Sequence, residues 1–147
     1  MKNSLKKEDI CALFGGYRHC SQIVISQWAE EFGMDEEQAI QLMAPFGGGC
    51  FQGEVCGAVS GAMAVIGLAY GHSVIGDEEG NIQMMGITAE FIERFKEKHG
   101  TIICRELLQD YDFSKDGDLE RAMNDGVCFD ICPTIVQDAL TILEEII

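Results

Sequence analysis

The sequence predicts an all-α fold, a single-domain bundle of about six to eight helices around a central helix rich in glycine and alanine. Apolar residues recur at three- and four-residue spacing, and the β-branched alternation typical of strands is weak. The chain has 147 residues, of which 47% are hydrophobic, so it is long enough to bury an ordinary core. Nothing marks a domain boundary or an internal repeat. Residues 1–147 are therefore predicted to form one domain.

The first half of the chain supplies four predicted helical segments. A short apolar stretch covers residues 10–17, and residues 20–32 carry apolar side chains at helical spacing before Gly33. Residues 35–44 begin with an acidic first turn, which the helix dipole favours. Residues 57–70 form the predicted central helix, because its small residues let a neighbouring helix approach closely and its larger ones fill the core.

The second half begins with a polar, glycine-containing stretch, residues 72–85, which is predicted to be a loop. Residues 87–98 have one apolar and one charged side and are predicted to be helical. Shorter helices are predicted at residues 102–108 and 119–123, and a strong one at residues 133–147.

The formal net charge of −15 argues against a nucleic-acid partner and against anionic membrane surfaces, since both require an excess of lysine and arginine. The amino-terminal segment is basic but lacks the apolar region of a signal peptide. The longest apolar run, residues 55–70, is too short to span a bilayer. A soluble, cytoplasmic protein is expected.

Seven cysteines are the main functional signal: Cys11, Cys20, Cys50, Cys56, Cys104, Cys128 and Cys132. Thiols stay reduced in the cytoplasm, so such a density favours catalytic, redox-sensing or metal-binding roles over structural disulfides. No pair has Cys-x-x-Cys spacing, and no Cys/His quartet has zinc-finger spacing. Ligands that converge only in space remain compatible with a metal site.

Four of the cysteines fall at predicted helix starts: Cys20, Cys56, Cys104 and Cys132. The free N–H groups and positive dipole of a helix N-terminus stabilise a thiolate and are expected to lower its pKa. Arg18 and Arg105 are adjacent in sequence to two of these cysteines and are expected to add to the effect. Stabilisation of the thiolate by these nearby groups matters because the overall negative charge of the chain opposes thiolate formation.

The other three cysteines carry a weaker signal. Cys11 lies among apolar residues and is expected to be a small buried hydrophobe. For Cys50 and Cys128 packing and function are equally open. Cys128 lies four residues before Cys132, so the two would share a face if the last helix began early.

Several motifs occur in order along the chain: Cys20-Ser21-Gln22, Phe46-Gly47-Gly48-Gly49, Cys56-Gly57-Ala58-x-x-Gly61, Cys104-Arg105-Glu106-Leu107-Leu108 and Cys132-Pro133. Together they resemble the C_GCAxxG_C_C family of redox-active proteins. The resemblance extends from about residue 20 to the carboxyl terminus. It implies a small prokaryotic protein with a redox role, whose four characteristic cysteines correspond to Cys20, Cys56, Cys104 and Cys132. The closeness of Cys128 to Cys132 leaves open which of them is the fourth.

The expected function is thiol–disulfide exchange or redox sensing among Cys20, Cys56, Cys104 and Cys132. If the protein is an enzyme, it would be a thiol-dependent oxidoreductase, with Cys56 as the attacking thiol because its glycine-rich approach leaves room for a partner sulfur. No flavin or nicotinamide fingerprint occurs, so a separate protein or a small thiol is expected to supply electrons.

Two other readings stay open. The same four cysteines could hold zinc or an iron–sulfur cluster, or most cysteines could be packing residues of a binding module. Asp112, Ser114, Asp116 and Asp118 resemble the first half of a calcium loop, but Met123 stands where a bidentate glutamate is required. An acidic turn is the favoured interpretation there.

Overall fold

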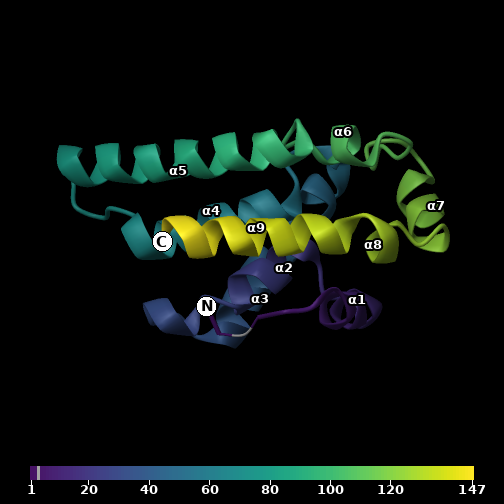
Figure 1. The fold of residues 1–147 in the computed structure, drawn as a ribbon, viewed down its shortest axis with the longest axis horizontal. Coiled ribbons are helices and arrows are strands. Elements are labelled where there is room, and N and C mark those ends of the chain that lie inside the picture. Colours follow the sequence, from purple (N-terminus) through teal and green to yellow (C-terminus); the bar gives the residue numbers. More distant parts are fainter. Residues whose placement is uncertain (3) are drawn as a thin grey trace.

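The computed structural model describes residues 1–2 and 4–147, and Asn3, part of the basic amino-terminal segment, lies outside the described residues. The all-α prediction is confirmed: the described residues form nine α-helices and no strand (Figure 1). The α-helices are α1 (Lys7–Gly15), α2 (Cys20–Ser26), α3 (Glu36–Met43), α4 (Gly57–Tyr70), α5 (Glu78–His99), α6 (Cys104–Leu108), α7 (Asp118–Asn124), α8 (Val127–Asp130) and α9 (Cys132–Ile146). The count exceeds the predicted range by one.

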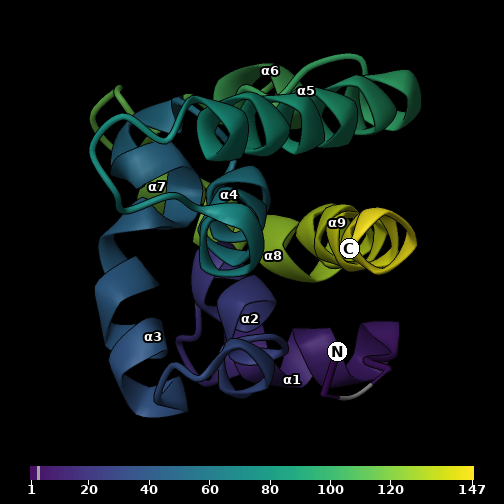
Figure 2. The same cartoon turned by 90° about the vertical axis from the view of Figure 1, so that its left-hand side faces the viewer.

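The helices pack around α4, as predicted. The long helices α5 and α9 run antiparallel and side by side, and α4 contacts both of them and α2 (Figures 1 and 2). Helix α2 in turn packs against α3. The main core is formed by the buried apolar faces of these helices. A smaller cluster of Cys104, Leu108, Ala122 and Val127 lies under the short helices.

Two glycines of α4 explain its close contact with α2. A Cβ built at Gly61 would come within 2.8 Å of the Ser21 carbonyl oxygen and 2.9 Å of the Val24 Cβ. A Cβ at Gly57 would overlap the Cys20 Sγ. The small residues of α4 therefore set the depth at which α2, and with it Cys20, enters the core.

Two predicted elements differ from the structure. The predicted helix at residues 20–32 ends at Ser26 and is followed by the 3₁₀ turn Glu30–Phe32. The predicted loop at residues 72–85 is wrong in its second half, because α5 begins at Glu78, where the Asp77 carboxylate accepts a hydrogen bond from the Gly80 N–H at 2.9 Å. The first turns of α5 expose Ile82 and Met85, which hides the helical pattern.

The helix that prediction missed is α8, a single turn that follows Gly126, a residue in the left-handed region at φ 79°. Among the described residues, no helix has both the length and the apolar character needed to cross a membrane.

Candidate functional site

The four cysteines predicted at helix starts are found there. Cys20, Cys104 and Cys132 are the first residues of α2, α6 and α9, and Cys56 is the N-cap of α4. Two of the local signals that predicted these helix starts are present in the structure. Pro133 occupies the first turn of α9, and glycine-rich backbone precedes α4.

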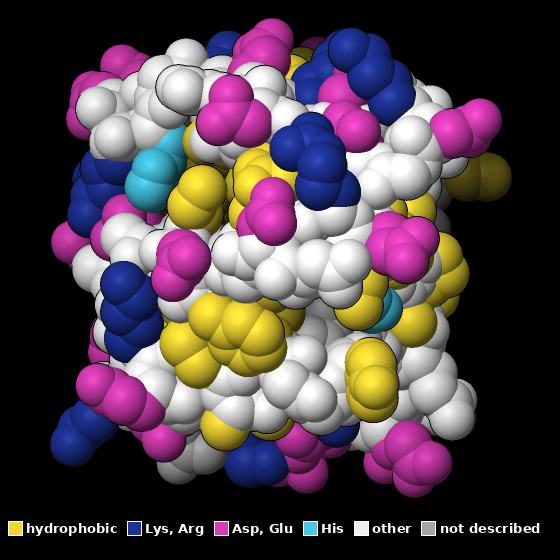
Figure 3. Space-filling model, turned by 90° about the vertical axis from the view of Figure 1, so that its right-hand side faces the viewer, with side chains coloured by type: hydrophobic (Ala, Val, Ile, Leu, Met, Phe, Trp, Pro, Cys, Tyr) yellow, Lys and Arg dark blue, Asp and Glu magenta, His cyan; other side chains and the backbone are white. Residues whose placement is uncertain are grey.

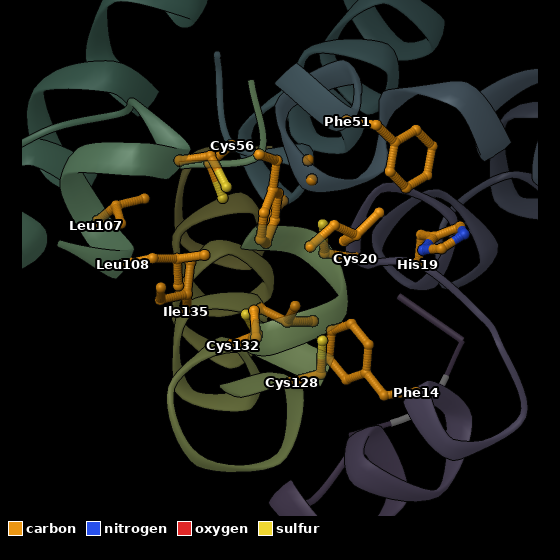
Figure 4. A pocket seen from close by; sticks show the side chains of 18 of the residues that line it. Phe14, His19, Cys20, Phe51, Cys56, Leu107, Leu108, Cys128, Cys132 and Ile135 are labelled. Atoms are coloured by element: carbon orange, nitrogen blue, oxygen red, sulfur yellow. The ribbon is translucent and has the colours of Figure 1, made fainter. Parts of the chain in front are cut away.

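These four thiols and Cys128 line one cavity of about 110 Å³ (Figure 4). The rest of its wall is largely apolar, with aromatic side chains from Phe14, Phe51 and Phe113. Cys11 and Cys50 are not among the residues that line it. The fold thus gathers five of seven cysteines, separated by up to 112 positions in sequence (132 − 20), around one space.

Cys20 is held between α4 and the loop that contains Gly47, Gly48 and Gly49. Its sulfur packs against the backbone of Gly57, and the Gly48 N–H donates a hydrogen bond to it. Gly47 packs against the His19 ring, where a Cβ would lie 2.6 Å from the His19 Cβ. Gly47 is therefore required for the close approach of this loop to the start of α2.

Cys56 and Cys104 are brought together by an isolated antiparallel bridge between Val55 and Ile103. The Cys56 N–H donates to the Ile102 carbonyl oxygen at 2.8 Å, and the Cys104 N–H donates to the Glu54 carbonyl oxygen at 2.6 Å. Side chains alternate along extended backbone, so residues 56, 102 and 104 project to the same face of this bridge. The bridge thereby aims two thiols from separate helices into the cavity.

Cys128 and Cys132 are joined by a nearly continuous helical path. Ile131, between α8 and α9, has right-handed helical dihedrals, and its N–H donates to the Val127 carbonyl oxygen at 3.0 Å. Residues four apart on such a path share a face. The last helix does not begin early, since α9 starts at Cys132, but the helical path through Ile131 still places the two thiols on one face. Cys128 is thus a member of the cluster that the helix-start criterion alone did not select.

The predicted lowering of pKa at the four helix starts is wrong in its net direction. Burial raises the pKa of Cys104 to about 12 and also raises the pKa of Cys20 and Cys56. Backbone hydrogen bonds at Cys20 and Cys56 do act in the expected direction, but burial is the larger effect. The neighbouring sulfurs add to the rise, because each thiolate disfavours another close to it.

Cys128 behaves in the opposite way. A hydrogen bond with the Cys132 thiol lowers the pKa of Cys128 to about 7, and the same hydrogen bond, together with burial, raises the pKa of Cys132. Cys128 is half-buried, whereas Cys56 and Cys104 are buried. This arrangement does not favour the sequence-based choice of Cys56 as the attacking thiol.

Of the two arginines proposed from sequence, Arg105 has a small effect, and Arg18 is not among the main influences on the pKa of Cys20. The Arg105 guanidinium donates to the Gly53 carbonyl oxygen at 3.2 Å and pairs with Glu54 at 3.0 Å, and it lowers the Cys104 pKa less than burial raises it. The pKa of His19 is lowered by burial, and its ring packs edge-on against Phe51 at 4.9 Å between centroids.

The loop before Cys56 is strained. Cys50 and Phe51 have φ of 58° and 54°, in the left-handed region that non-glycine residues rarely adopt. Both follow Gly48 and Gly49, which also have positive φ. Phe51 lines the cavity while Cys50 is exposed, so the strain lies at the edge of the site.

The remaining candidates lie apart from the cluster. Cys11 was expected to be buried, but it is partly exposed. Its Sγ donates a hydrogen bond to the Phe129 carbonyl oxygen at 3.7 Å. In the acidic loop, Asp112 accepts hydrogen bonds from Ser114 and Asp118 accepts one from the Asp112 N–H. Across the described residues, no three His, Cys, Asp or Glu side chains are arranged to hold a metal ion.

Comparison with known protein families confirms the resemblance seen in the sequence motifs. The family model described as "Putative redox-active protein (C_GCAxxG_C_C)" matches residues 18–146. The chain belongs to the C_GCAxxG_C_C family. The match covers α2 through α9 and leaves residues 1–17, which include α1, and Ile147 outside it. No curated protein and no solved structure matches the chain. Family membership supports a redox role in general terms and leaves the chemistry to be argued from the site.

Proposed function

We propose that this protein carries out thiol–disulfide exchange or redox sensing through Cys20, Cys56, Cys104 and Cys132. The observation that supports this most is that four thiols at the starts of four different helices line the same apolar cavity. Cysteines used only for packing have no reason to share both a helix-start position and a cavity.

Helix starts suit exchange because charge passes between sulfurs during the reaction. A thiolate attacks one sulfur of a disulfide, a new S–S bond forms, and the other sulfur leaves as a thiolate. Buried thiols with raised pKa remain protonated at rest. N–H groups at the N-termini stabilise a thiolate formed transiently as the leaving group.

The electrons would come from outside this chain, from a separate protein or a small thiol that exchanges at an accessible cysteine. A protein partner would present a basic face to this chain, whose net charge is −15. We expect the association rate to fall by about tenfold or more between low and physiological salt, as for steered complexes. A rate that does not depend on salt would point to an uncharged small thiol instead.

The alternative is a zinc or iron–sulfur site on the same four cysteines. It accounts for the convergence of thiols, but the described side chains are not arranged as a metal-ligand group. Elemental analysis and a visible spectrum of anaerobically purified protein separate the two readings. Stoichiometric zinc or iron, retained on gel filtration, would support the alternative.

Mass spectrometry of alkylated peptides, after controlled oxidation and reduction, tests the exchange proposal. Oxidation is expected to link a pair that includes at least one of Cys20, Cys56, Cys104 and Cys132, and dithiothreitol is expected to release it. Cys56→Ser is expected to change the pattern, while Cys50→Ser, outside the cavity, is the matched control. If oxidation links none of the four and Cys56→Ser changes nothing, exchange among these thiols is excluded.

A further inference from the structure

Cys128 is one of three half-buried thiols in the cysteine cluster, together with Cys20 and Cys132. It lies on α8 and lines the cavity together with Phe14 of α1, which is next to it in Figure 4. It is half-buried, whereas Cys56 and Cys104 have only 6% and 7% of their surface exposed. An incoming reagent therefore meets Cys128 more readily than the two thiols of the bridge.

A second thiol stands beside it. Cys132 lies four residues further along the same helical path and hydrogen-bonds with Cys128. The effect is to favour the thiolate of Cys128, whose pKa falls to about 7, and to keep the proton on Cys132. The titratable side chains that line the cavity with this pair are Tyr17, Arg18, His19, Cys20, Cys56 and Cys104.

The cavity limits what can reach this pair. Its volume of about 110 Å³ is comparable to the apolar cavity of about 150 Å³ known to accept benzene. Tyr17, Leu119 and Met123 line it and are 80%, 37% and 53% exposed, so the cavity reaches the surface between α1 and α7. Figure 3 shows this end of the molecule, where hydrophobic groups are interspersed with acidic and basic side chains.

The largely apolar wall disfavours a charged group, because an ion loses hydration there and Arg18 is the one permanently charged side chain among the described residues that line the cavity. The net charge of −15 also repels anionic reagents such as oxidised glutathione. A disulfide that carries an uncharged aromatic or short aliphatic group meets neither obstacle. Phe14, Phe51 and Phe113 supply aromatic surface for such a group.

We propose that Cys128 is the thiol that first attacks an incoming disulfide, that Cys132 resolves the product, and that the substrate is an uncharged disulfide with one aromatic or short aliphatic group in the cavity. The inference rests on the exchange function proposed above. It adds to that function a fifth cysteine, beyond the four proposed above, and a class of substrate.

The proposed reduction takes place in two exchange steps. The Cys128 thiolate attacks one sulfur of the substrate, an S–S bond forms between them, and the other substrate half leaves as a thiolate. Cys132 then loses its proton and attacks the Cys128 sulfur, which releases the second half as a thiolate. The Cys128–Cys132 disulfide forms, and the substrate disulfide is reduced to two thiols.

The test uses 4,4′-dithiodipyridine, an uncharged aromatic disulfide whose released thiopyridone absorbs light, in stopped-flow mixing with the full-length reduced protein. A fast phase that releases two thiopyridones is expected. Its rate should rise with pH through an apparent pKa near 7. A thiol ionised to this extent should react about fivefold faster at neutral pH than one with an ordinary pKa, after allowance for its weaker nucleophilicity.

Variants assign the roles. Cys128→Ser and Cys128→Ala are expected to abolish the fast phase, and Cys132→Ser, whose hydroxyl can still donate a hydrogen bond, to release one thiopyridone in that phase. Cys50→Ser is expected to match the wild type. Oxidised glutathione is expected to react at least about tenfold more slowly than the uncharged probe. A fast phase that survives both Cys128 substitutions overturns the assignment of Cys128, and equal rates for the two disulfides overturn the substrate class.

The two proposals fail in different ways. If peptide mapping finds reversible disulfides among the family cysteines while both Cys128 variants react like the wild type, the role of Cys128 is refuted and exchange stands. If no reversible disulfide forms in the wild type, exchange itself is refuted.

Discussion

The sulfur of Cys20 packs against the backbone of Gly57, in the space that a side chain at position 57 would fill. Gly57, the residue after Cys56, thus has a physical role: it makes room for Cys20. One sequence element, Cys56-Gly57, contributes one thiol to the cavity and the space for a second.

Substitution of Gly57 tests this relationship. Gly57→Ala is expected to lower the free energy of unfolding by about 1–3 kcal/mol, because the added methyl group overlaps the Cys20 sulfur and the Phe46 carbonyl oxygen. Gly67→Ala in the same helix is the matched control. A Cβ at position 67 meets open space among the described residues. Gly67→Ala should therefore raise the free energy of unfolding by about 0.4–1 kcal/mol. Urea unfolding measures both, and equal midpoints for the two variants would contradict the packing.

Burial of the thiols predicts a loss of stability at alkaline pH. The pKa of Cys104 is raised to about 12 in the folded protein, so this thiol keeps its proton where the unfolded chain has lost it. Its contribution to stability is present below the unfolded pKa of about 8.5 and is lost as pH rises from there towards 12, at up to about 1.4 kcal/mol per pH unit. Cys104→Ala is expected to flatten the pH dependence by up to that amount. Urea unfolding between pH 8 and 10 measures how the free energy of unfolding changes with pH, and Cys50→Ala is the control. Equal slopes of this free energy against pH for the wild type and Cys104→Ala would contradict the burial of Cys104.

Backbone strain at Cys50 predicts a stabilising substitution. Cys50 is exposed and has a φ of 58°, a conformation that glycine adopts without penalty. Cys50→Gly is expected to raise the free energy of unfolding by up to about 1 kcal/mol. Cys50→Ala keeps the Cβ and should give no gain. Thermal unfolding compares the two, and a more stable alanine variant would show that the position is not strained.

The helix starts of the cysteine motif were predictable because their signals are local. Proline after Cys132 and the glycine-rich approach to Cys56 act within a few residues, and the structure begins its helices there. The start of α5 was not predictable in this way, since its exposed Ile82 and Met85 break the apolar pattern.

The chemistry of the site depends on contacts that no local pattern encodes. The pKa of Cys56 rises because distant helices bury it, and the bridge between Val55 and Ile103 joins segments 48 positions apart (103 − 55). The position of Cys128 depends on the single turn of α8, which is too short to show helical periodicity. Its four-residue spacing from Cys132 was the one signal available.

A redox titration of the wild-type protein tests the central claim most directly. The protein is equilibrated in dithiothreitol buffers of graded potential, quenched with acid, alkylated, and its disulfides are quantified by peptide mapping. We expect one reversible two-electron transition in which a disulfide forms between cysteines that line the cavity, while Cys11 and Cys50 stay reduced. A protein that keeps all seven thiols across the range, or that first links Cys11 or Cys50, would contradict the account.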